Sequence, residues 1–152
     1  MSLEKILQED RQAILDEAVE SLCRAHLKHY ETAGSDLIRE RLDNLLGIVL
    51  EALLKRSLTP IVNHAAAVAV ERFEAGVDLH EVQTAFNVLE EILWLRILKV
   101  LPATEQAGAL GLIGTVLGNG KDALARKYVS MATQTRTPSL DLKALFSGSD
   151  SF

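Results

Sequence analysis

The chain has 152 residues and a mass of 16.6 kDa, which is the size of one domain and argues against an enzyme with a separate cofactor domain. Apolar residues form 48% of the chain and charged residues 24%, a composition too hydrophobic for an intrinsically disordered protein. The 16 basic and 21 acidic side chains give a net charge of −5, so the positive field that attracts nucleic acid is missing and neither DNA nor RNA is expected as a partner.

Two helices are expected in the first part of the chain. Apolar residues recur there at helical rather than alternating spacing, which predicts an all-α fold. The first helix is expected to run without interruption over residues 3–32, because the first residue typical of a helix end is Gly34. A second helix is expected to begin at Ser35 or Asp36 and to continue to about Ser57.

A glycine separates the third helix from the fourth. Pro60 favours the start of the third helix, which is expected to end before Gly76. Asp78 and Glu81 have the spacing of a capping box, in which the aspartate accepts a backbone N–H group and the glutamate reaches back to the cap. The fourth helix is therefore expected to begin directly after Asp78.

This fourth helix, expected over residues 79–101, is the most hydrophobic one, and Pro102 ends it. Its apolar positions cover most of its circumference: Leu79, Val82, Phe86, Leu89, Ile92, Leu93, Ile97 and Val100. A helix that is apolar on nearly all sides is buried. We therefore expect it to lie at the centre of a single helical bundle of about five main helices.

The fifth helix is expected to begin near Thr104 and to end near Gln134. Its glycines each weaken a helix by about 1 kcal/mol relative to alanine, which predicts a bend or a break in its middle. Residues 135–152 are rich in Ser, Thr, Pro and Gly. They are expected to form a flexible extension or linker after a helical domain of residues 1–134.

Several features favour the cytoplasm. Cys23 is the only cysteine, so it cannot form an internal disulfide, which fits a reducing compartment. The N-terminal residues are charged and lack the apolar core of a signal peptide. No stretch reaches the roughly 20 apolar residues that a membrane span needs. We expect a cytoplasmic protein that does not enter a membrane.

Two arginines occupy positions where leucine is expected. Arg96 lies in the middle of the apolar arc of the fourth helix, and Arg72 lies among apolar residues of the third. One interpretation is that each guanidinium reaches water or pairs with a carboxylate such as Glu71, Glu74 or Glu90. The other is that Arg72 or Arg96 forms a subsite for a carboxylate or phosphate ligand, to which the planar guanidinium is suited.

No pattern in the chain predicts catalysis or a bound metal. Cys23, His26 and His29 are evenly spaced, but their side chains would fan out over a helix and lack a fourth ligand for zinc. The run from Gly118 to Asp122 resembles the end of a phosphate-binding loop, yet it lacks the first glycine, the final Ser or Thr and a preceding strand. We expect no enzymatic activity, no catalytic residue, no metal and no cofactor.

Small residues form a strip along the fifth helix, beside a ladder of larger apolar residues that recur every seven positions. The strip contains Ala107, Gly111, Gly114, Gly118 and Ala125, and the ladder contains Leu110, Leu117, Leu124 and Met131. Such a strip lets another helix approach closely, either within the fold or across a two-fold interface of a homodimer. Both interpretations remain open for Gly111, Gly114, Leu117, Gly118 and Leu124.

One stretch resembles a known family. It reads Glu71-Arg72-Phe73-Glu74-Ala75-Gly76-Val77-Asp78-Leu79-His80-Glu81-Val82 and continues through Phe86, Leu89 and Trp94. This stretch is similar to the signature of the N-terminal domain of RsbRD-type stressosome co-antagonists, in which Arg72 and Gly76 match the Arg and the Gly. The chain up to about residue 134 also matches that family in size and helix order.

The resemblance implies a helical, globin-like input domain that binds no haem and carries no catalysis. In such proteins this domain dimerises and precedes a signalling output domain, such as an anti-sigma-antagonist-type domain, a histidine kinase or a transcription regulator. The present sequence ends at Phe152 without an output domain. It is therefore expected to be either a stand-alone relative or an excised domain.

The predicted function is that of a non-catalytic sensory or regulatory input domain of a bacterial signalling protein. It would act through homodimerisation and small-ligand binding, with Arg72 and Arg96 as candidate ligand-binding residues and an output domain or partner protein as its target. One alternative is a haem-binding globin-type sensor with His64 as the axial ligand. Another is a stand-alone helical module for protein interaction.

Overall fold

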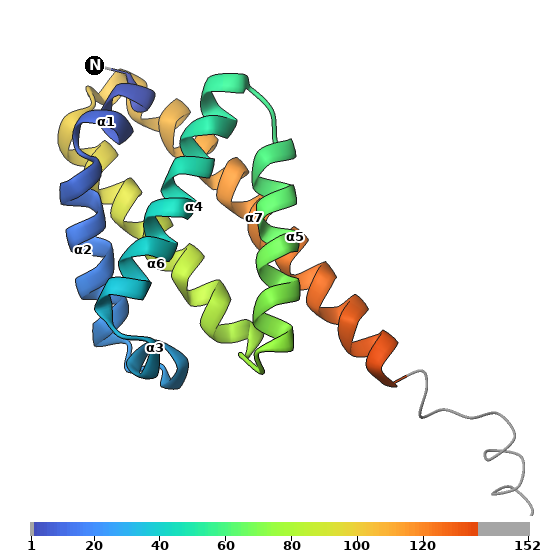
Figure 1. Ribbon diagram of the computed structural model, residues 1–152. Coiled ribbons are helices and arrows are strands. Elements are labelled where there is room, and N and C mark those ends of the chain that lie inside the picture. Colours follow the sequence, from blue (N-terminus) through green and yellow to red (C-terminus); the bar gives the residue numbers. More distant parts are fainter. Residues whose placement is uncertain (1, 137–152) are drawn as a thin grey trace, which may run out of the picture.

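The structure, a computed structural model, describes residues 2–136 and contains only helices in that range (Figure 1). The helices are α1 (Leu3–Glu9), α2 (Arg11–Arg24), α3 (Lys28–Ala33), α4 (Ser35–Lys55), α5 (Thr59–Glu74), α6 (Leu79–Val100) and α7 (Ala103–Arg136). The predicted all-α class is confirmed. Among the described residues, no helix combines the length and the hydrophobicity needed to cross a membrane.

The expected first helix is in fact three helices. Asp10 caps α1 and also opens α2, with a backbone ψ of 12° that turns the chain away from the axis of α1. A second break follows Arg24, where His26 has a left-handed φ of 51° and Leu27 is extended. The prediction failed here because neither break carries a proline or glycine, so the breaks depend on how α1 and α3 pack against the other helices.

The boundaries of the later helices agree with the prediction. α4 starts at Ser35 and α5 carries Pro60 in its first turn. Gly76 follows α5 with a φ of 76°, a left-handed conformation that a glycine adopts without strain. These boundaries could be predicted because proline and glycine affect the backbone conformation at their own positions.

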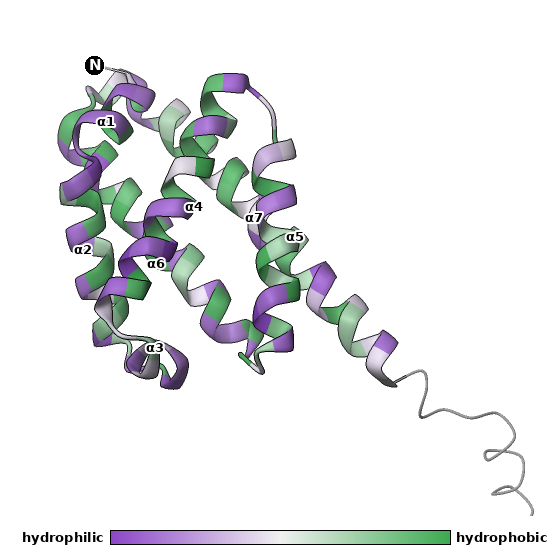
Figure 2. Cartoon of the chain, viewed as in Figure 1, coloured by the Kyte–Doolittle hydropathy of each residue, from purple (hydrophilic) through white to green (hydrophobic). Residues whose placement is uncertain are grey.

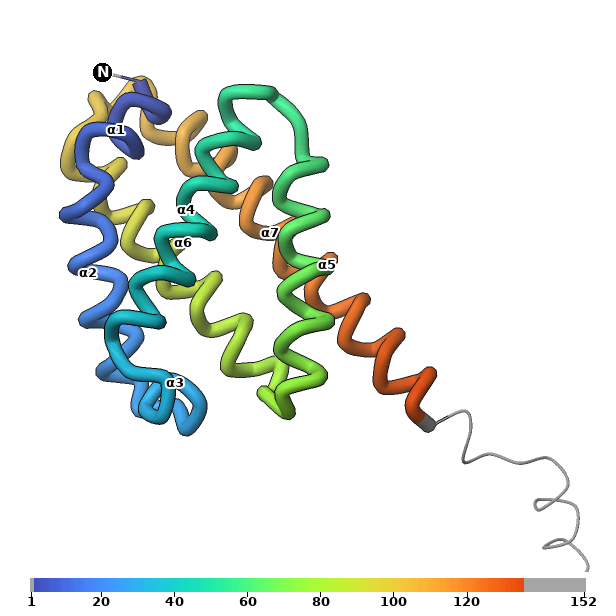
Figure 3. The backbone as a smooth tube through the Cα atoms, viewed as in Figure 1, coloured from blue at the N-terminus to red at the C-terminus, as the bar shows by residue number. Residues whose placement is uncertain are grey.

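The helices form two layers around one core. α2, α4 and α5 lie in front in the view of Figure 3, and α6 and α7 cross behind them. α4 contacts each of the other helices, and α5 packs most extensively against α7. Hydrophilic residues lie on the outward faces of α2 and α4 (Figure 2). The largest fully buried side chains are Ile6, Leu7, Ile14, Leu15, Leu22, Leu42, Leu46, Ile61, Leu89, Leu93, Ile97 and Ile113.

α6 is buried on one face only, which differs from the predicted central position. Val82, Phe86 and Leu89 are among its buried residues, whereas Trp94 and Leu98 are 44% and 49% exposed. The helix therefore carries apolar residues on a solvent-exposed face. Its apolar circumference indicated complete burial, but part of that surface has no partner among the described residues.

α7 is one continuous helix despite its glycines, so the predicted break is wrong. Gly120 explains part of this tolerance: a Cβ atom there would lie 2.9 Å from Ile61 Cγ1 and 3.0 Å from Phe86 Cε2. Only a residue without a side chain lets α7 come this close to α5 and α6. The predicted extension 135–152 lies outside the described residues apart from Thr135 and Arg136, which continue α7.

Candidate functional site

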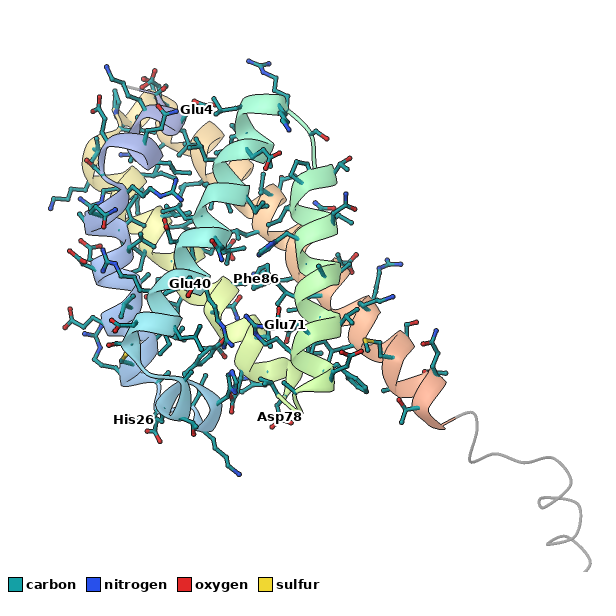
Figure 4. The ribbon with its side chains drawn as sticks, viewed as in Figure 1. Glu4, His26, Glu40, Glu71, Asp78 and Phe86 are labelled. Atoms are coloured by element: carbon teal, nitrogen blue, oxygen red, sulfur yellow. The ribbon has the colours of Figure 1, made fainter. Side chains whose placement is uncertain are left out.

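A pocket of about 120 Å³ lies where α3, α4, α5 and α6 meet. Its polar lining includes Tyr30 from α3, Arg41 from α4 and His64 and Arg72 from α5, and its apolar lining includes Phe86 from α6. The labelled side chains of Glu71 and Phe86 lie between α4 and α5 in Figure 4. This pocket brings charged and aromatic groups from four helices together.

Arg72 is the buried charged residue in the lining of this pocket. It is 7% exposed and is the only charged residue among the buried residues of the described chain. Its Nη1 donates a hydrogen bond to Glu71 Oε1, so the predicted pairing with a neighbouring carboxylate is confirmed. The side chain of Glu71 is itself 68% exposed. The partner of this buried cation therefore lies mainly in water.

Arg41 is a second cation at the pocket, and sequence reasoning did not single it out. It is half-buried, and its Nη1 donates a hydrogen bond to Nε2 of His29 at 2.8 Å. Burial, and next the nearby Arg72, lower the pKa of Arg41. Arg41 lies in a run of polar residues on α4, and only the packing of α4 against α5 distinguishes it from its neighbours.

The histidines and the tyrosine around the pocket are neutral at pH 7. Burial, followed by Arg41, lowers the pKa of His29, so its unprotonated Nε2 accepts the bond from Arg41. Burial, and next Arg72, lower the pKa of His64. Burial raises the pKa of Tyr30 to about 12, against the opposing effect of Arg72. The hydroxyl of Tyr30 therefore keeps its proton.

The short helix α3 is bonded to α6 through Glu81, a residue that we expected to cap its own helix. Glu81 Oε2 accepts a hydrogen bond from the backbone N–H of His29 at 3.1 Å. Asp78 precedes α6 in an extended conformation, but its side chain makes no capping hydrogen bond. The predicted capping box is therefore wrong, because Glu81 binds another helix instead of its own cap.

Arg96 lies in a different part of the molecule and does not line the pocket. Its side chain is 12% exposed, and its Nη2 donates to Glu17 Oε1 at 2.7 Å. Its Nη1 lies 3.8 Å from Asp10 Oδ2. Asp10 is the residue before α2 and Glu17 lies in the middle of α2, and both differ from the carboxylates proposed from the sequence. The structure thus separates the two candidate ligand-binding arginines.

The residues of the rejected zinc pattern do not share a helix, because α2 ends at Arg24, between Cys23 and His26. Within residues 2–136, no group of three or more His, Cys, Asp or Glu side chains could hold a metal ion. His64 lines the pocket, but a volume of about 120 Å³ is well below the roughly 300–1,000 Å³ of typical cofactor pockets. The geometry therefore does not favour the haem alternative.

The candidate packing residues on α7 fall into two groups. Leu117 and Leu124 are fully buried and belong to the core of the domain. A Cβ atom at Gly111 or Gly118 would meet no atom within 4 Å, and one at Gly114 would lie 3.9 Å from Glu90 Oε1. The ladder therefore packs within the fold, and the glycine strip is open towards solvent.

The family of the RsbT co-antagonist protein RsbRD N-terminal domain matches residues 12–146. The chain belongs to this family. The match runs from the first turn of α2 through the whole of α7, and it confirms the resemblance seen in residues 71–82. The family consists of input domains of stressosome-type regulatory proteins and is not a known enzyme family. No curated protein and no solved structure matches the chain significantly.

The structure gives the family signature a physical role in this RsbRD N-terminal domain. The backbone N–H groups of Val77 and Gly76 donate to the carbonyls of Arg72 and Phe73 at 2.9 and 3.0 Å, the pattern of a Schellman motif. The hydroxyl of Tyr128 on α7 donates to the carbonyl of Val77 at 3.0 Å. The glycine therefore ends α5, and the turn after it binds α7.

Proposed function

We propose that this RsbRD N-terminal domain is a non-catalytic sensory or regulatory input domain of a bacterial signalling protein in the cytoplasm. The observation that carries the proposal is the family match over residues 12–146, since the family consists of regulatory input domains. The domain would receive a small ligand in the pocket beside Arg72 and act on a second copy and on an output domain or partner protein.

The chemistry of the pocket supports binding rather than catalysis. Arginine side chains such as those of Arg41 and Arg72 do not act as general acids or bases in proteins. The pKa of Tyr30, about 12, makes its hydroxyl a poor acid. His64, a possible base, lies near the cation of Arg72 and has a lowered pKa. These groups can orient a ligand, but they do not form the acid–base pair that a proton transfer needs.

The α6–α7 face, defined here as Trp94, Leu98, Gly111 and Gly118, supports association of two copies. Two hydrogen bonds set the antiparallel register of α6 and α7: Lys121 Nζ to Glu90 Oε2 at 2.8 Å and Gln106 Nε2 to the carbonyl of Leu98 at 3.3 Å. Trp94 lies one helical turn from Glu90, and Gly111 lies one turn from Gly114, which approaches Glu90. The exposed tryptophan and the open glycines therefore lie on the same side of the helix pair.

A second copy fits this face better than a small molecule does. The glycines allow the backbone of a partner helix to approach closely, and an exposed tryptophan is typical of the centre of a protein interface. Closed two-fold dimers bury the same surface from both subunits. We propose that the homodimer forms through the α6–α7 face.

α7 is the proposed connector to an output domain or partner protein. Its C-terminal turns extend past the other helices in Figure 1. Tyr128 is the last residue of α7 that is buried in the domain, and Val129 next to it is 63% exposed. A helix that packs against α5 and α6 along its length and then leaves the bundle can carry a change in their packing to an attached domain or a bound partner.

Light scattering coupled to gel filtration, over a range of concentrations, tests the dimer. We expect the wild-type protein to be a dimer and the Gly111→Arg variant to be a monomer, because the long cation would stand in the interface. Leu112→Arg is the matched control: Leu112 is exposed, but it faces the pocket formed with α1 and α4, so its variant is expected to remain a dimer. A wild-type protein that is monomeric at every concentration would contradict the proposed mode of action.

A further inference from the structure

The pocket holds more positive than negative charge. Arg41 and Arg72 line it, and among the residues of the described chain Glu71 is the one acidic residue that lines it. Because the side chain of Glu71 is largely exposed, water and salt screen its charge from the buried guanidinium groups. We infer that the pocket binds a small anion, either a carboxylate or an oxyanion such as phosphate, between Arg41 and Arg72; this inference rests on the proposed ligand pocket and adds the class of its ligand.

Arg41 lacks an anionic partner in the structure. Its hydrogen bond goes to the neutral His29, and in the described part of the chain no carboxylate oxygen lies within 4.0 Å of its guanidinium. A guanidinium has five N–H donors, and buried cations are normally paired with anions. Two cations in one pocket also repel each other, and Arg72 contributes to the lowered pKa of Arg41. A bound anion would pair with both and relieve this repulsion.

Tyr30 adds a third donor at the pocket. Its side chain is buried and lines the pocket, and its hydroxyl makes no hydrogen bond within residues 2–136. With a pKa of about 12 the hydroxyl keeps its proton and can donate. Arg41, Arg72 and Tyr30 thus present donors from three helices to one space. The complementary ligand is a group that only accepts hydrogen bonds, which is the property of a carboxylate or an oxyanion.

The size of the pocket limits the ligand to a small molecule. Its volume of about 120 Å³ is slightly below the 150 Å³ or so of a cavity that holds benzene, which suits a ligand of about four to six non-hydrogen atoms. Acetate, pyruvate, phosphate and sulfate have this size. Apolar residues such as Val68, Val82 and Phe86 also line the pocket, and their low polarity strengthens an ion pair formed there.

Arg96 is a largely buried arginine whose charge is already balanced by carboxylates. It pairs with Glu17 and Asp10, which reach it from a neighbouring helix. No further anion is needed there. Arg96 therefore has two carboxylate partners. Arg72, at similar burial, has a single carboxylate partner, whose side chain is mostly exposed to solvent.

Thermal unfolding of the full chain tests the inference. Sodium acetate, pyruvate, phosphate and sulfate are each exchanged for sodium chloride at constant ionic strength. We expect carboxylates, oxyanions or both to raise the melting temperature by about 3 °C or more once the anion is tenfold above its Kd. Arg41→Gln and Arg72→Gln are expected to lose this rise. Arg39→Gln, a control on the same helix whose arginine pairs with Asp16 on α2, is expected to keep it.

The pattern of response identifies the ligand chemistry. A rise with acetate and pyruvate alone indicates a carboxylate site, and a rise with phosphate and sulfate alone indicates an oxyanion site. An equal rise in the wild type and in both glutamine variants would show only the general stabilisation that such salts produce, and it would overturn the inference. So would the lack of a rise with any of the four anions.

A second measurement does not depend on variants that fold. In two-dimensional NMR spectra of the wild-type protein, the anion is expected to shift the backbone amide signals of Tyr30, Arg41 and Phe86 and to leave those of Glu17 and Arg96 unchanged. Light scattering on the same samples separates the two proposals. A dimer without an anion response overturns the anion site alone, whereas a monomer with that response contradicts the dimer and supports the anion site.

Discussion

Arg72 is buried and Arg96 is largely buried, in similar sequence settings, and their surroundings are opposite. Arg96 links α6 to α2 through Glu17 and Asp10, so its charge is balanced by residues distant in sequence. Arg72 pairs with its sequence neighbour Glu71, which is mostly exposed, and shares its pocket with a second cation, Arg41. The first arrangement joins helices, and the second leaves positive charge available to a ligand.

The comparison extends to the arginines of α2 and its neighbour α4. Arg11 Nε donates to Asp43 Oδ1 at 2.7 Å, and Arg39 Nη1 donates to Asp16 Oδ1 at 2.6 Å. Each of these pairs joins α2 to α4, in the same way that Arg96 joins α6 to α2. Arg41 therefore stands apart from the other arginines of this region, since its guanidinium bonds to His29 and has no carboxylate oxygen of the described chain within 4.0 Å.

The largest expected effect concerns the close packing of α7 against α5 and α6. Gly120→Val is expected to lower the free energy of unfolding by about 2–3 kcal/mol, because the new side chain would collide with Ile61 and with Phe86, which lines the pocket. Gly108→Val, the same change at an open position of α7 outside the α6–α7 face, is expected to be neutral or slightly stabilising. Urea unfolding of both variants checks this, and equal losses would show that α7 does not approach α5 as described.

Replacing each arginine by methionine sharpens the comparison directly. Arg96→Met is expected to cost about 1–2 kcal/mol of stability, because α2 and α6 lose the ion pairs that join them. Arg72→Met is expected to cost less or to stabilise the unliganded domain, because it removes a buried charge whose partner is exposed.

The measurement for this pair is thermal unfolding in sodium chloride, without the test anions. A greater loss for Arg72→Met than for Arg96→Met would reverse the comparison. It would mean that Glu71, although exposed, stabilises Arg72 more than two carboxylates stabilise Arg96.

The smallest expected effect is a pH dependence of stability that arises from His64, which lines the pocket. The pKa of His64 in the folded protein is lowered from 6.5 by burial and Arg72, so below about pH 6.5 the unfolded chain binds more protons at this residue than the folded one. Stability is therefore lost as the pH falls from 7 to 5. His64→Gln is expected to lose less stability over this interval than the wild type.

Urea unfolding at pH 7 and pH 5 measures the difference. His80→Gln, a change at an exposed histidine, is the control and is expected to follow the wild type. If His64→Gln and the wild type lost the same stability, His64 would not be a neutral group held beside a cation.

Local sequence signals account for the helical class and for most helix boundaries from residue 34 onward. Pro60, Gly76 and Pro102 each act within a turn of where they stand, and all mark a boundary in the structure. The position of Arg72 among apolar residues also followed from the periodicity of its own helix, and the structure shows that it is buried there. These features were predictable because each depends on residues close in sequence.

Other features came from contacts between distant segments. The breaks near Asp10 and His26, the hydrogen bond of Glu81 to α3 and the place of Arg41 at the pocket all depend on how whole helices cross. A helical period states which residues share a face, but it does not state which face of another helix they meet.

The sequence by itself determined that this protein is helical, belongs to the RsbRD N-terminal domain family and carries Arg72 on the apolar side of α5, because periodicity, capping and signature are local properties. Only the tertiary structure decided which charges are balanced. Glu17 and Asp10 lie within 4.0 Å of the guanidinium of Arg96, and no carboxylate oxygen of the described chain lies that close to Arg41. Ion pairs form only between side chains that the packing of the helices brings within a few ångströms.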